Sequence, residues 1–424
     1  CVEVCPAKDR QNPEIKAINM MSRLEHVEEE KVNYDFFLNL PEIDRTKLER
    51  IDIRTSQLIT PLFEYSGACS GCGETPYIKL LTQLYGDRML IANATGCSSI
   101  YGGNLPSTPY TTDANGRGPA WANSLFEDNA EFGLGFRLTV DQHRVRVMRL
   151  LEQFADNIPA ELNDALHAEA TPEVRREQVA ALRQHLKDVE GAQQLLTDAD
   201  ALVEKSIWLI GGDGWAYDIG FGGLDHVLSL TENVNILVLD TQCYSNTGGQ
   251  ASKATPLGAV TKFGEHGKRK ARKDLGVSMM MYGHVYVAQI SLGAQLNQTV
   301  KAIQEAEAYP GPSLIIAYSP CEEHGYDLAL SHDQMRQLTA TGFWPLYRFD
   351  PRRADEDKLP LALDSRPPSD ALAETLLNEQ RFRRLNAQQP EVAEQLWKDA
   401  AADLQKRYDF LAQLAGKAEK SGAE

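Results

Sequence analysis

The sequence lacks long apolar runs, a secretory signal and an excess of positive charge. Apolar segments such as Ile236–Leu239 and Leu314–Ala317 are far shorter than the roughly 20 residues that a membrane-spanning helix needs. The amino terminus does not show the basic, then apolar, then small-residue order of a secretory signal. These absences predict a cytoplasmic protein that does not span a membrane.

Acidic residues outnumber basic ones, which leaves a formal net charge of -17 at pH 7. Such a charge repels nucleic-acid phosphates and anionic lipid head groups, so we expect no nucleic-acid partner and no membrane partner. Hydrophobic residues make up 42% of the chain and charged residues 24%, which is typical of globular proteins. A chain of 424 residues exceeds one compact core, so we expect one large domain with helical attachments.

Composition changes along the chain predict three parts. Residues 1–50 have no sustained apolar face. Residues 51–340 carry short segments of branched apolar residues separated by helix-length stretches, which predicts an α/β domain with a mostly parallel sheet and helices on both faces. A charged segment at about 140–202 predicts a helical insertion, and residues 341–424 predict a helical extension that packs on the domain or supports a dimer.

A glycine-rich turn, Gly211-Gly212-Asp213-Gly214, follows the strand predicted over residues 207–210. Glycines let a backbone approach phosphate oxygens, and a following helix offers free N–H groups to an anion. The Asp213 carboxylate is a suitable Mg²⁺ ligand at the carboxyl end of a strand. The next predicted strand ends in residues 240–249, which bring further oxygen donors to the same edge. The alternative is a glycine-rich turn without a ligand.

One pair of cysteines stands in a pattern typical of metal ligation: Cys69 and Cys72 form a Cys-x-x-Cys pair, and Cys97 follows further along the chain. Two thiolates on one turn suit a zinc ion or one corner of an iron–sulfur cluster. Spacing alone does not decide between zinc, a cluster and a redox dithiol. An odd total of seven cysteines without an export signal favours ligated or reduced thiols over disulfides.

Three runs together resemble the carboxy-terminal portion of pyruvate:ferredoxin (flavodoxin) oxidoreductases. They are Gly-Ala-Cys-Ser-Gly-Cys-Gly-Glu-Thr-Pro-Tyr from residue 67, Gly-Asp-Gly-Trp-Ala-Tyr-Asp-Ile-Gly from residue 212, and Tyr-Ser-Asn-Thr-Gly-Gly-Gln from residue 244. The resemblance implies a thiamine-diphosphate-binding fold of the diphosphate type. It also implies thiamine diphosphate, Mg²⁺ and a proximal [4Fe-4S] cluster as cofactors, with coenzyme A as co-substrate.

The same resemblance implies specific ligands. Mg²⁺ would be held by Asp213, the side chain of Thr241 and the carbonyl of Cys243. The cluster would be held by Cys69, Cys72, Cys97 and Cys321. Thiamine diphosphate would contact Glu74, Cys97, Gly212, Asp213, Gly214, Trp215, Thr241, Gln242, Cys243, Tyr244, Ser245 and Asn246. Asn246 would also reach the substrate as a catalytic residue, whereas a solvated loop carboxylate is the alternative for Glu74.

Cys1, Cys5 and Pro6 match the end of the bacterial ferredoxin run Cys-x2-Cys-x2-Cys-x3-Cys-Pro. This match predicts that residues 1–50 are the remnant of a two-cluster ferredoxin module and a linker. The chain would then be a fragment, and Cys1 and Cys5 would be former cluster ligands. Unligated surface thiols are the alternative, and in neither case do we expect a ferredoxin cluster.

The implied activity is the oxidative decarboxylation of pyruvate to acetyl-CoA and CO2, with electrons passing to ferredoxin or flavodoxin. In the resembled family the activating glutamate and the substrate arginine lie in amino-terminal domains that this sequence lacks. We therefore expect an isolated chain to be inactive without those domains of the same polypeptide, and to function in a homodimer. The alternatives are an oxidoreductase for another 2-oxoacid and a non-catalytic module with zinc on the four cysteines.

Overall fold

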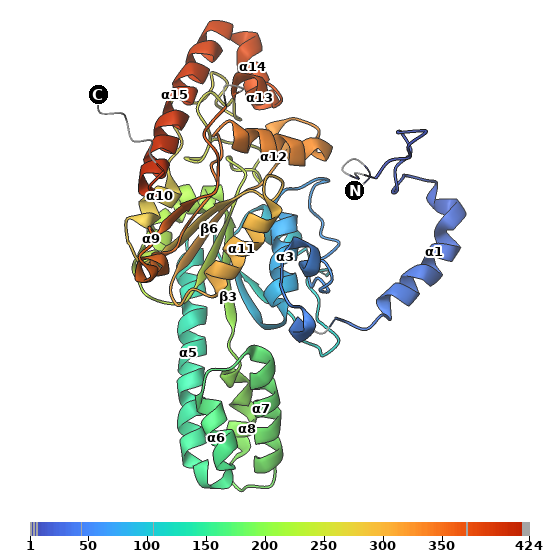
Figure 1. The fold of residues 1–424 in the computed structure, drawn as a ribbon, viewed down its shortest axis with the longest axis vertical. Helices are drawn as coiled ribbons and strands as arrows, with labels where there is room; N and C mark the ends of the chain where they lie inside the picture. Colours follow the sequence, from blue (N-terminus) through green and yellow to red (C-terminus); the bar gives the residue numbers. More distant parts are fainter. Residues whose placement is uncertain are drawn as a thin grey trace.

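The computed structural model describes residues 2, 5, 7–43, 45–104, 106–369 and 372–417. Its centre is an eight-stranded sheet with helices on both faces (Figure 1). The order across the sheet is β2-β1-β3-β4-β6-β5-β7-β8, and its two antiparallel pairings are those that β7 makes with β5 and β8. The predicted fold class is thereby confirmed. The strands are β1 (Met89–Asn93), β2 (Ala120–Asn123), β3 (Ser206–Gly212), β4 (Asn235–Asp240), β5 (Tyr286–Ile290), β6 (Ser313–Tyr318), β7 (Tyr347–Phe349) and β8 (Leu361–Leu363).

The central strands are buried on both faces, which explains their unbroken apolar sequences. In β3, Leu209 packs into the core on one face of the sheet, while Trp208 and Ile210 pack into the core on the other. This alternation follows because successive side chains of a strand point to opposite faces. The strands predicted from short apolar segments are all present.

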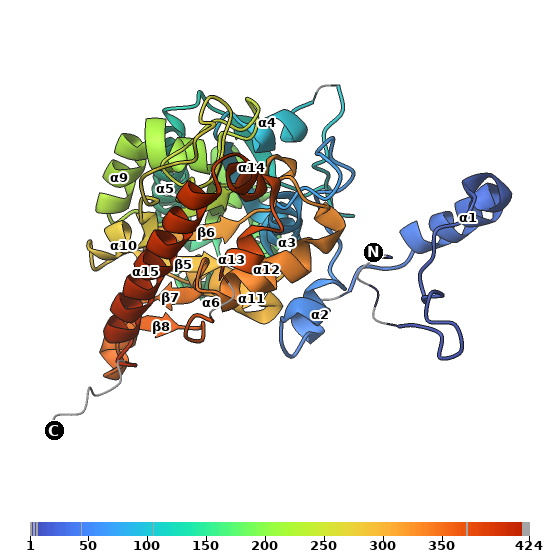
Figure 2. The same cartoon turned by 90° about the horizontal axis from the view of Figure 1, so that it is seen from above.

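Helices cover the two faces of the sheet in separate groups (Figures 1 and 2). One face packs against α5 (Asn129–Gln153), α9 (Phe221–Ser229), α10 (Leu275–Met280) and α15 (Pro390–Leu414). The other packs against α3 (Thr75–Tyr85), α4 (Cys97–Gly102) and α11 (Leu296–Glu307). The remaining α-helices are α1 (Arg23–Leu38), α2 (Ile53–Ser56), α6 (Ala160–His167), α7 (Pro172–Leu186), α8 (Gln193–Asp198), α12 (Ser331–Ala340), α13 (Leu372–Leu376) and α14 (Gln380–Gln388).

The segment between β2 and β3 is helical, in line with the predicted insertion, although its first helix already begins at Asn129. Helix α5 runs from the sheet into a separate group formed with α6, α7 and α8 (Figure 1). That group has its own apolar core, which includes Val147, Leu151 and Leu182. The limits of a separate domain stay a prediction.

The segment after residue 340 is not purely helical as predicted. It ends in the long helix α15, which the apolar periodicity of the tail predicts, but it also contributes β7 and β8 to the sheet. Each of these strands has only three residues, which is too short to show a periodic pattern.

The amino-terminal segment that contains α1 extends away from the sheet in both views (Figures 1 and 2). Helix α1 has no buried residue. In the part of the chain that the structure describes, no helix is both long enough and apolar enough to cross a bilayer.

Candidate functional site

The topology of the sheet brings the predicted ligands to one edge. Strands β3, β4 and β6 are parallel neighbours, so their carboxyl ends meet, as they do at the ligand sites of open α/β sheets. Asp213 directly follows β3, Thr241 directly follows β4, and Cys321 lies shortly after β6. Residues that are distant in sequence therefore converge there.

The three oxygen donors predicted for Mg²⁺ lie together. The Thr241 hydroxyl is 3.0 Å from the Asp213 carboxylate and 3.1 Å from the carbonyl oxygen of Cys243. Adjacent ligands of an octahedral Mg²⁺ ion with bonds of about 2.1 Å are about 3 Å apart. The donor set thus fits Mg²⁺ in both chemistry and spacing.

Asp213 is the acidic group that faces this site. It is fully buried, and burial together with the nearby Asp240 raises the pKa of Asp213 to about 8. Asp240 itself is ion-paired with Arg272 at 2.8 Å and accepts a hydrogen bond from Tyr217 at 2.8 Å. Asp240 already has a cationic partner in Arg272. Asp213 instead accepts hydrogen bonds from the neutral hydroxyl groups of Thr241 and Ser252. A bound cation would stabilise the ionised form of Asp213.

A π-helical turn, Gly214–Ile219, begins directly after Asp213. Its pattern is visible in the backbone hydrogen bond from Gly220 to Trp215 at 2.9 Å. The ring of Tyr244 packs against Gly214, where an added Cβ would lie 2.5 Å from a ring carbon. Only glycine allows this approach. Single π-helical turns are frequent at functional sites.

A cavity of about 270 Å³ lies over these elements. Two glycines in its wall, Gly96 and Gly212, have almost nothing near the point where a Cβ would project: at Gly96 no atom lies within 4 Å of that point, and at Gly212 only a backbone oxygen does, at 3.9 Å. Both glycines line the cavity and have open space around their Cβ positions, so both leave room for a ligand against the backbone. The predicted cofactor contacts that line the cavity are Glu74, Cys97, Gly212, Asp213, Gly214, Trp215, Cys243, Tyr244, Ser245 and Asn246.

The cavity has further lining residues that the sequence did not indicate. Phe126 faces Tyr244 with ring centroids 6.0 Å apart. Nothing in the sequence marks Phe126, because it lies in a connection between β2 and α5 that only the fold brings over the site. Thr95, Gly96 and Ser98 also line the cavity, and their position beside the predicted contact Cys97 is a signal that could have found them. Thr247 lines it too and lies in the segment 240–249 that the sequence already indicated.

Glu74 is not a solvated loop carboxylate. It is only 3% exposed, and the hydroxyl of Tyr101 donates a hydrogen bond to its carboxylate at 3.0 Å. Burial raises the pKa of Glu74 to about 7. The alternative considered for this residue is therefore wrong.

All four predicted cluster ligands line a second cavity, of about 140 Å³. Burial raises the pKa of the Cys72 thiol to about 12 and that of Cys97 to about 12. Among the described residues, no group of three or more His, Cys, Asp or Glu side chains is arranged to hold a single metal ion. The four cysteines line a common space, and metal binding by them is a proposal.

Close backbone packing joins the two cysteine loops. The Gly73 amide donates to the carbonyl of Pro320, next to Cys321, at 2.9 Å. A Cβ at Gly73 would lie 2.2 Å from Pro320, so this approach requires glycine. Gly71 adopts a φ of +78° within the Cys-x-x-Cys turn, which also favours glycine.

The two cavities share a wall. Glu74, Cys97, Ser245 and Asn246 line both of them. The sulfur of Cys97 lies 3.4 Å from the hydroxyl of Ser245, so the cysteine loop touches the predicted cofactor loop. The predicted catalytic residue Asn246 belongs to this wall.

Some predicted site residues lie elsewhere. Thr241 lines the cysteine cavity rather than the first one, and the side chain of Gln242 lines neither. Cys5 belongs to the amino-terminal segment and lines neither cavity. Cys1 lies outside the described residues.

Comparison with known proteins agrees with these features. A family model for the thiamine pyrophosphate enzyme, C-terminal TPP binding domain, matches residues 191–317. All 424 residues align at 94% identity with the probable pyruvate-flavodoxin oxidoreductase of Escherichia coli (strain K12), covering 36% of that protein. Over its whole length, the chain is similar to part of that pyruvate-flavodoxin oxidoreductase. The resemblance seen in the motifs is confirmed.

Other pyruvate oxidoreductases match over nearly the same region. The chain is 54% identical over 422 residues to a putative pyruvate-flavodoxin oxidoreductase of Synechocystis, which covers 97% of the chain and 35% of that protein. It is 47% identical over 429 residues to the pyruvate:ferredoxin oxidoreductase of Moorella thermoacetica, which covers 98% of the chain and 36% of that protein. The chain therefore spans about a third of the length of these pyruvate oxidoreductases.

A solved 2-oxoglutarate:ferredoxin oxidoreductase from Magnetococcus marinus superposes with a TM-score of 0.40 at 15% identity, covering 68% of this chain and 73% of that chain.

Proposed function

We propose that this chain forms the diphosphate and proximal-cluster side of a pyruvate:flavodoxin or pyruvate:ferredoxin oxidoreductase. The observation that carries the proposal is the wall shared by the two cavities, formed by Glu74, Cys97, Ser245 and Asn246. A cofactor in the first cavity and a cluster in the second would be separated by single side chains. Such closeness suits electron transfer between them.

Thiamine diphosphate would occupy the first cavity, with Mg²⁺ at the part of its wall where Asp213 lies. Asp213, Thr241 and the Cys243 carbonyl would hold the ion, and Gly212 would let the backbone approach the diphosphate. When bound, thiamine diphosphate supplies a nucleophilic carbon and an electron sink for decarboxylation of a 2-oxoacid. We assign Asn246 the contact with that substrate.

The four cysteines would hold a [4Fe-4S] cluster in the second cavity. Cluster ligands are thiolates, whereas burial keeps Cys72 and Cys97 protonated in the absence of metal. Metal binding would therefore release protons from these thiols. The space enclosed by the four side chains offers room for a group larger than one ion.

The proposed overall reaction joins pyruvate and coenzyme A into acetyl-CoA, with release of CO2, one proton and two electrons. The electrons would leave through the cluster to flavodoxin or ferredoxin. This reaction is supported by the names of the longer proteins to which the chain is similar, which are pyruvate-flavodoxin and pyruvate:ferredoxin oxidoreductases. Further domains of the same polypeptide, a homodimer and a cytoplasmic location belong to the same proposal.

The test is anaerobic reconstitution of the chain, followed by iron, sulfide and zinc analysis and by calorimetric titration with thiamine diphosphate and Mg²⁺. We expect about four irons per chain and Mg²⁺-dependent cofactor binding. Cys72→Ala should lose the iron. Cys5→Ala is the matched control, since Cys5 lines neither cavity, and it should keep the iron. Stoichiometric zinc without iron would overturn the cluster assignment and favour a non-catalytic module.

A further inference from the structure

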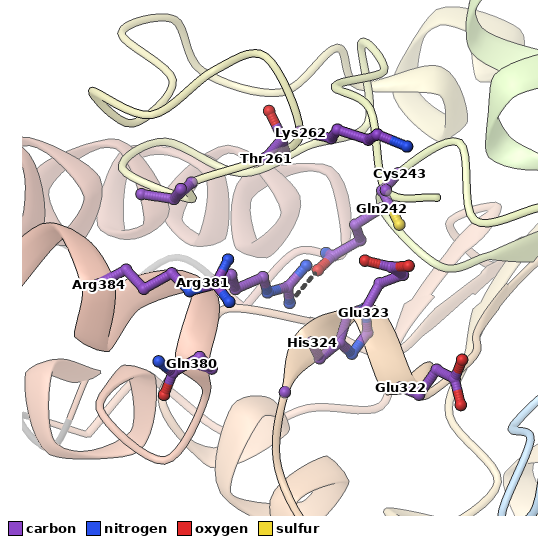
Figure 3. Close-up of a pocket in the computed structure, with 13 residues that line it drawn as sticks. Gln242, Cys243, Thr261, Lys262, Glu322, Glu323, His324, Gln380, Arg381 and Arg384 are labelled. Carbon is purple, nitrogen blue, oxygen red and sulfur yellow. Dashed lines mark hydrogen bonds between the residues drawn. The ribbon is translucent and has the colours of Figure 1, made fainter. Parts of the chain in front are cut away.

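The loop that carries the proposed Mg²⁺ ligands has a second face, turned toward a third cavity of about 140 Å³. Gln242 stands between Thr241 and Cys243, and its side chain points into this region together with His324 and Arg381 (Figure 3). Behind the metal site there is thus a separate group of polar side chains, which the proposed chemistry does not use.

Gln242 has an unusual backbone conformation. Its φ is +61°, in the left-handed region that residues with a side chain adopt rarely. Such a conformation persists only when surrounding contacts enforce it. The Gln242 amide donates to Asp240 at 3.0 Å, and its carbonyl accepts from the Thr255 hydroxyl at 2.7 Å. These contacts hold the two ends of the residue.

The side chain of Gln242 is held by a buried ion pair. Arg381 donates to the Gln242 side-chain oxygen at 2.8 Å, shown as a dashed line in Figure 3. The same guanidinium pairs with Glu379 at 2.6 Å, and Glu379 also accepts from Gln334 at 2.8 Å. Arg381 is 5% exposed, and Gln242 and Glu379 are fully buried. A rigid, water-excluded chain of contacts therefore ends on Gln242.

A second contact holds Thr241, the residue before Gln242. His324 is fully buried, and its Nε2 donates to the carbonyl of Thr241 at 2.7 Å. His324 follows the proposed cluster ligand Cys321 by three residues. Two segments thus hold the loop on the side away from the proposed ion. His324, which follows Cys321, bonds Thr241, and Arg381 at the start of α14 bonds Gln242.

We propose that Arg381 is a positioning residue for the metal site: through Gln242, it fixes the loop so that the Thr241 hydroxyl and the Cys243 carbonyl face the same ion. This proposal rests on the proposed function. It makes Mg²⁺-dependent cofactor binding depend on helix α14, although Arg381 lies 139 residues after Gln242 and touches neither the cofactor cavity nor the cysteine cavity.

The experiment measures the Mg²⁺ concentration that half-saturates thiamine diphosphate binding to the full chain, by calorimetry. Gln242→Ala removes the contact but leaves the Arg381–Glu379 pair intact, so the chain should still fold. Arg381→Lys keeps the charge beside Glu379 but lacks the planar fork with which the guanidinium bonds Glu379 and Gln242 at once. We expect each variant to need about 10- to 100-fold more Mg²⁺, as is typical when a residue that orients a metal ligand is lost.

Two further variants test whether weaker Mg²⁺ binding comes from a misplaced metal loop or from a general loss of stability. Gln242→Gly removes the same contact but accepts a positive φ without strain, so it should bind Mg²⁺ more tightly than Gln242→Ala. Arg384→Ala is the matched control: Arg384 is exposed, and it lines the same cavity in the next turn of α14. Its half-saturating concentration should equal that of the wild type.

The outcomes are distinct. If the wild type binds thiamine diphosphate with Mg²⁺ and Gln242→Ala does so at the same Mg²⁺ concentration, the positioning role of Arg381 is wrong. The positioning role would also be wrong if Gln242→Gly and Gln242→Ala needed equally more Mg²⁺ and both had a lowered melting temperature. A wild type that shows no Mg²⁺-dependent binding contradicts the proposed function instead.

Discussion

The hydroxyl of Thr241 lies 3.0 Å from the carboxylate of Asp213, although 28 residues separate them in sequence. Each directly follows a strand of the same parallel pair. The contact exists because parallel strands end at one edge of the sheet. It places two oxygen donors at the separation that neighbouring ligands of one Mg²⁺ ion would have.

Removing the charge of Asp213 should abolish Mg²⁺-dependent cofactor binding. Asp213→Asn keeps the size of the side chain but takes away the anionic ligand. Loss of a residue that only orients a metal ligand typically weakens metal binding by about 10- to 100-fold. Because Asp213 is itself a proposed ligand, we expect the affinity for thiamine diphosphate to fall by more than that. Calorimetric titration with thiamine diphosphate at fixed Mg²⁺ measures this. Asp225→Asn, on helix α9 outside both cavities, is the control, and unchanged binding by Asp213→Asn would refute the ligand assignment.

Filling the space at Gly212 should block the cofactor without harming the fold. An added Cβ meets only a backbone oxygen at 3.9 Å, so Gly212→Ala should keep the melting temperature of the wild type. Overpacking against a bound diphosphate costs about 1–3 kcal/mol, which is about 5- to 150-fold in affinity. Gly222→Ala has open space around the new methyl group and should bind normally. Normal binding by both variants would place the diphosphate elsewhere.

Glu307 should make the chain less stable as the pH rises. It accepts hydrogen bonds from Ser206 and Asn235 and pairs with Arg88, yet burial raises its pKa above 4.5. Between pH 4.5 and that higher pKa, the folded state keeps a proton that the unfolded state has released, so the free energy of unfolding decreases with increasing pH.

Glu307→Gln removes this titration. Compared with the wild type, its free energy of unfolding should therefore decline less between pH 4.5 and 7.5, as measured by urea denaturation at about four pH values. Glu169→Gln, at an exposed position of the insertion, should follow the wild type. A Glu307→Gln curve parallel to the wild type would contradict the assigned pKa direction.

The helical group between β2 and β3 should unfold on its own. Leu182→Ala deletes a fully buried side chain from its separate core, which typically costs about 2–5 kcal/mol. Hydrogen exchange should speed up in α6, α7 and α8 and stay unchanged in β3 and β4. Val174→Ala on the same helix, where Val174 is 44% exposed, is the control. Faster exchange throughout the sheet would show that the two cores unfold together.

Much of the fold and of the candidate site could be predicted because the signals are local. The segments 207–210 and 236–239 are apolar on both faces, which is typical of a strand buried between helices. The glycines around Asp213 mark a backbone that must approach a ligand, and the Cys-x-x-Cys pair marks a turn with two thiols. Such features lie within a few residues of one another, so no tertiary information is needed to detect them.

The tertiary structure alone decided what depends on distant pairing. Strands β7 and β8 form because an existing sheet edge pairs with them, not because their three residues have a pattern. Phe126 lines the cofactor cavity only through the path of its connection, and Arg381 reaches Gln242 across 139 residues. The sequence by itself determined which chemical groups this protein carries and which strands present them. Their distances, their burial and the buried contacts behind the metal loop arise only when the sheet assembles, because each depends on side chains that the chain folds together from remote positions.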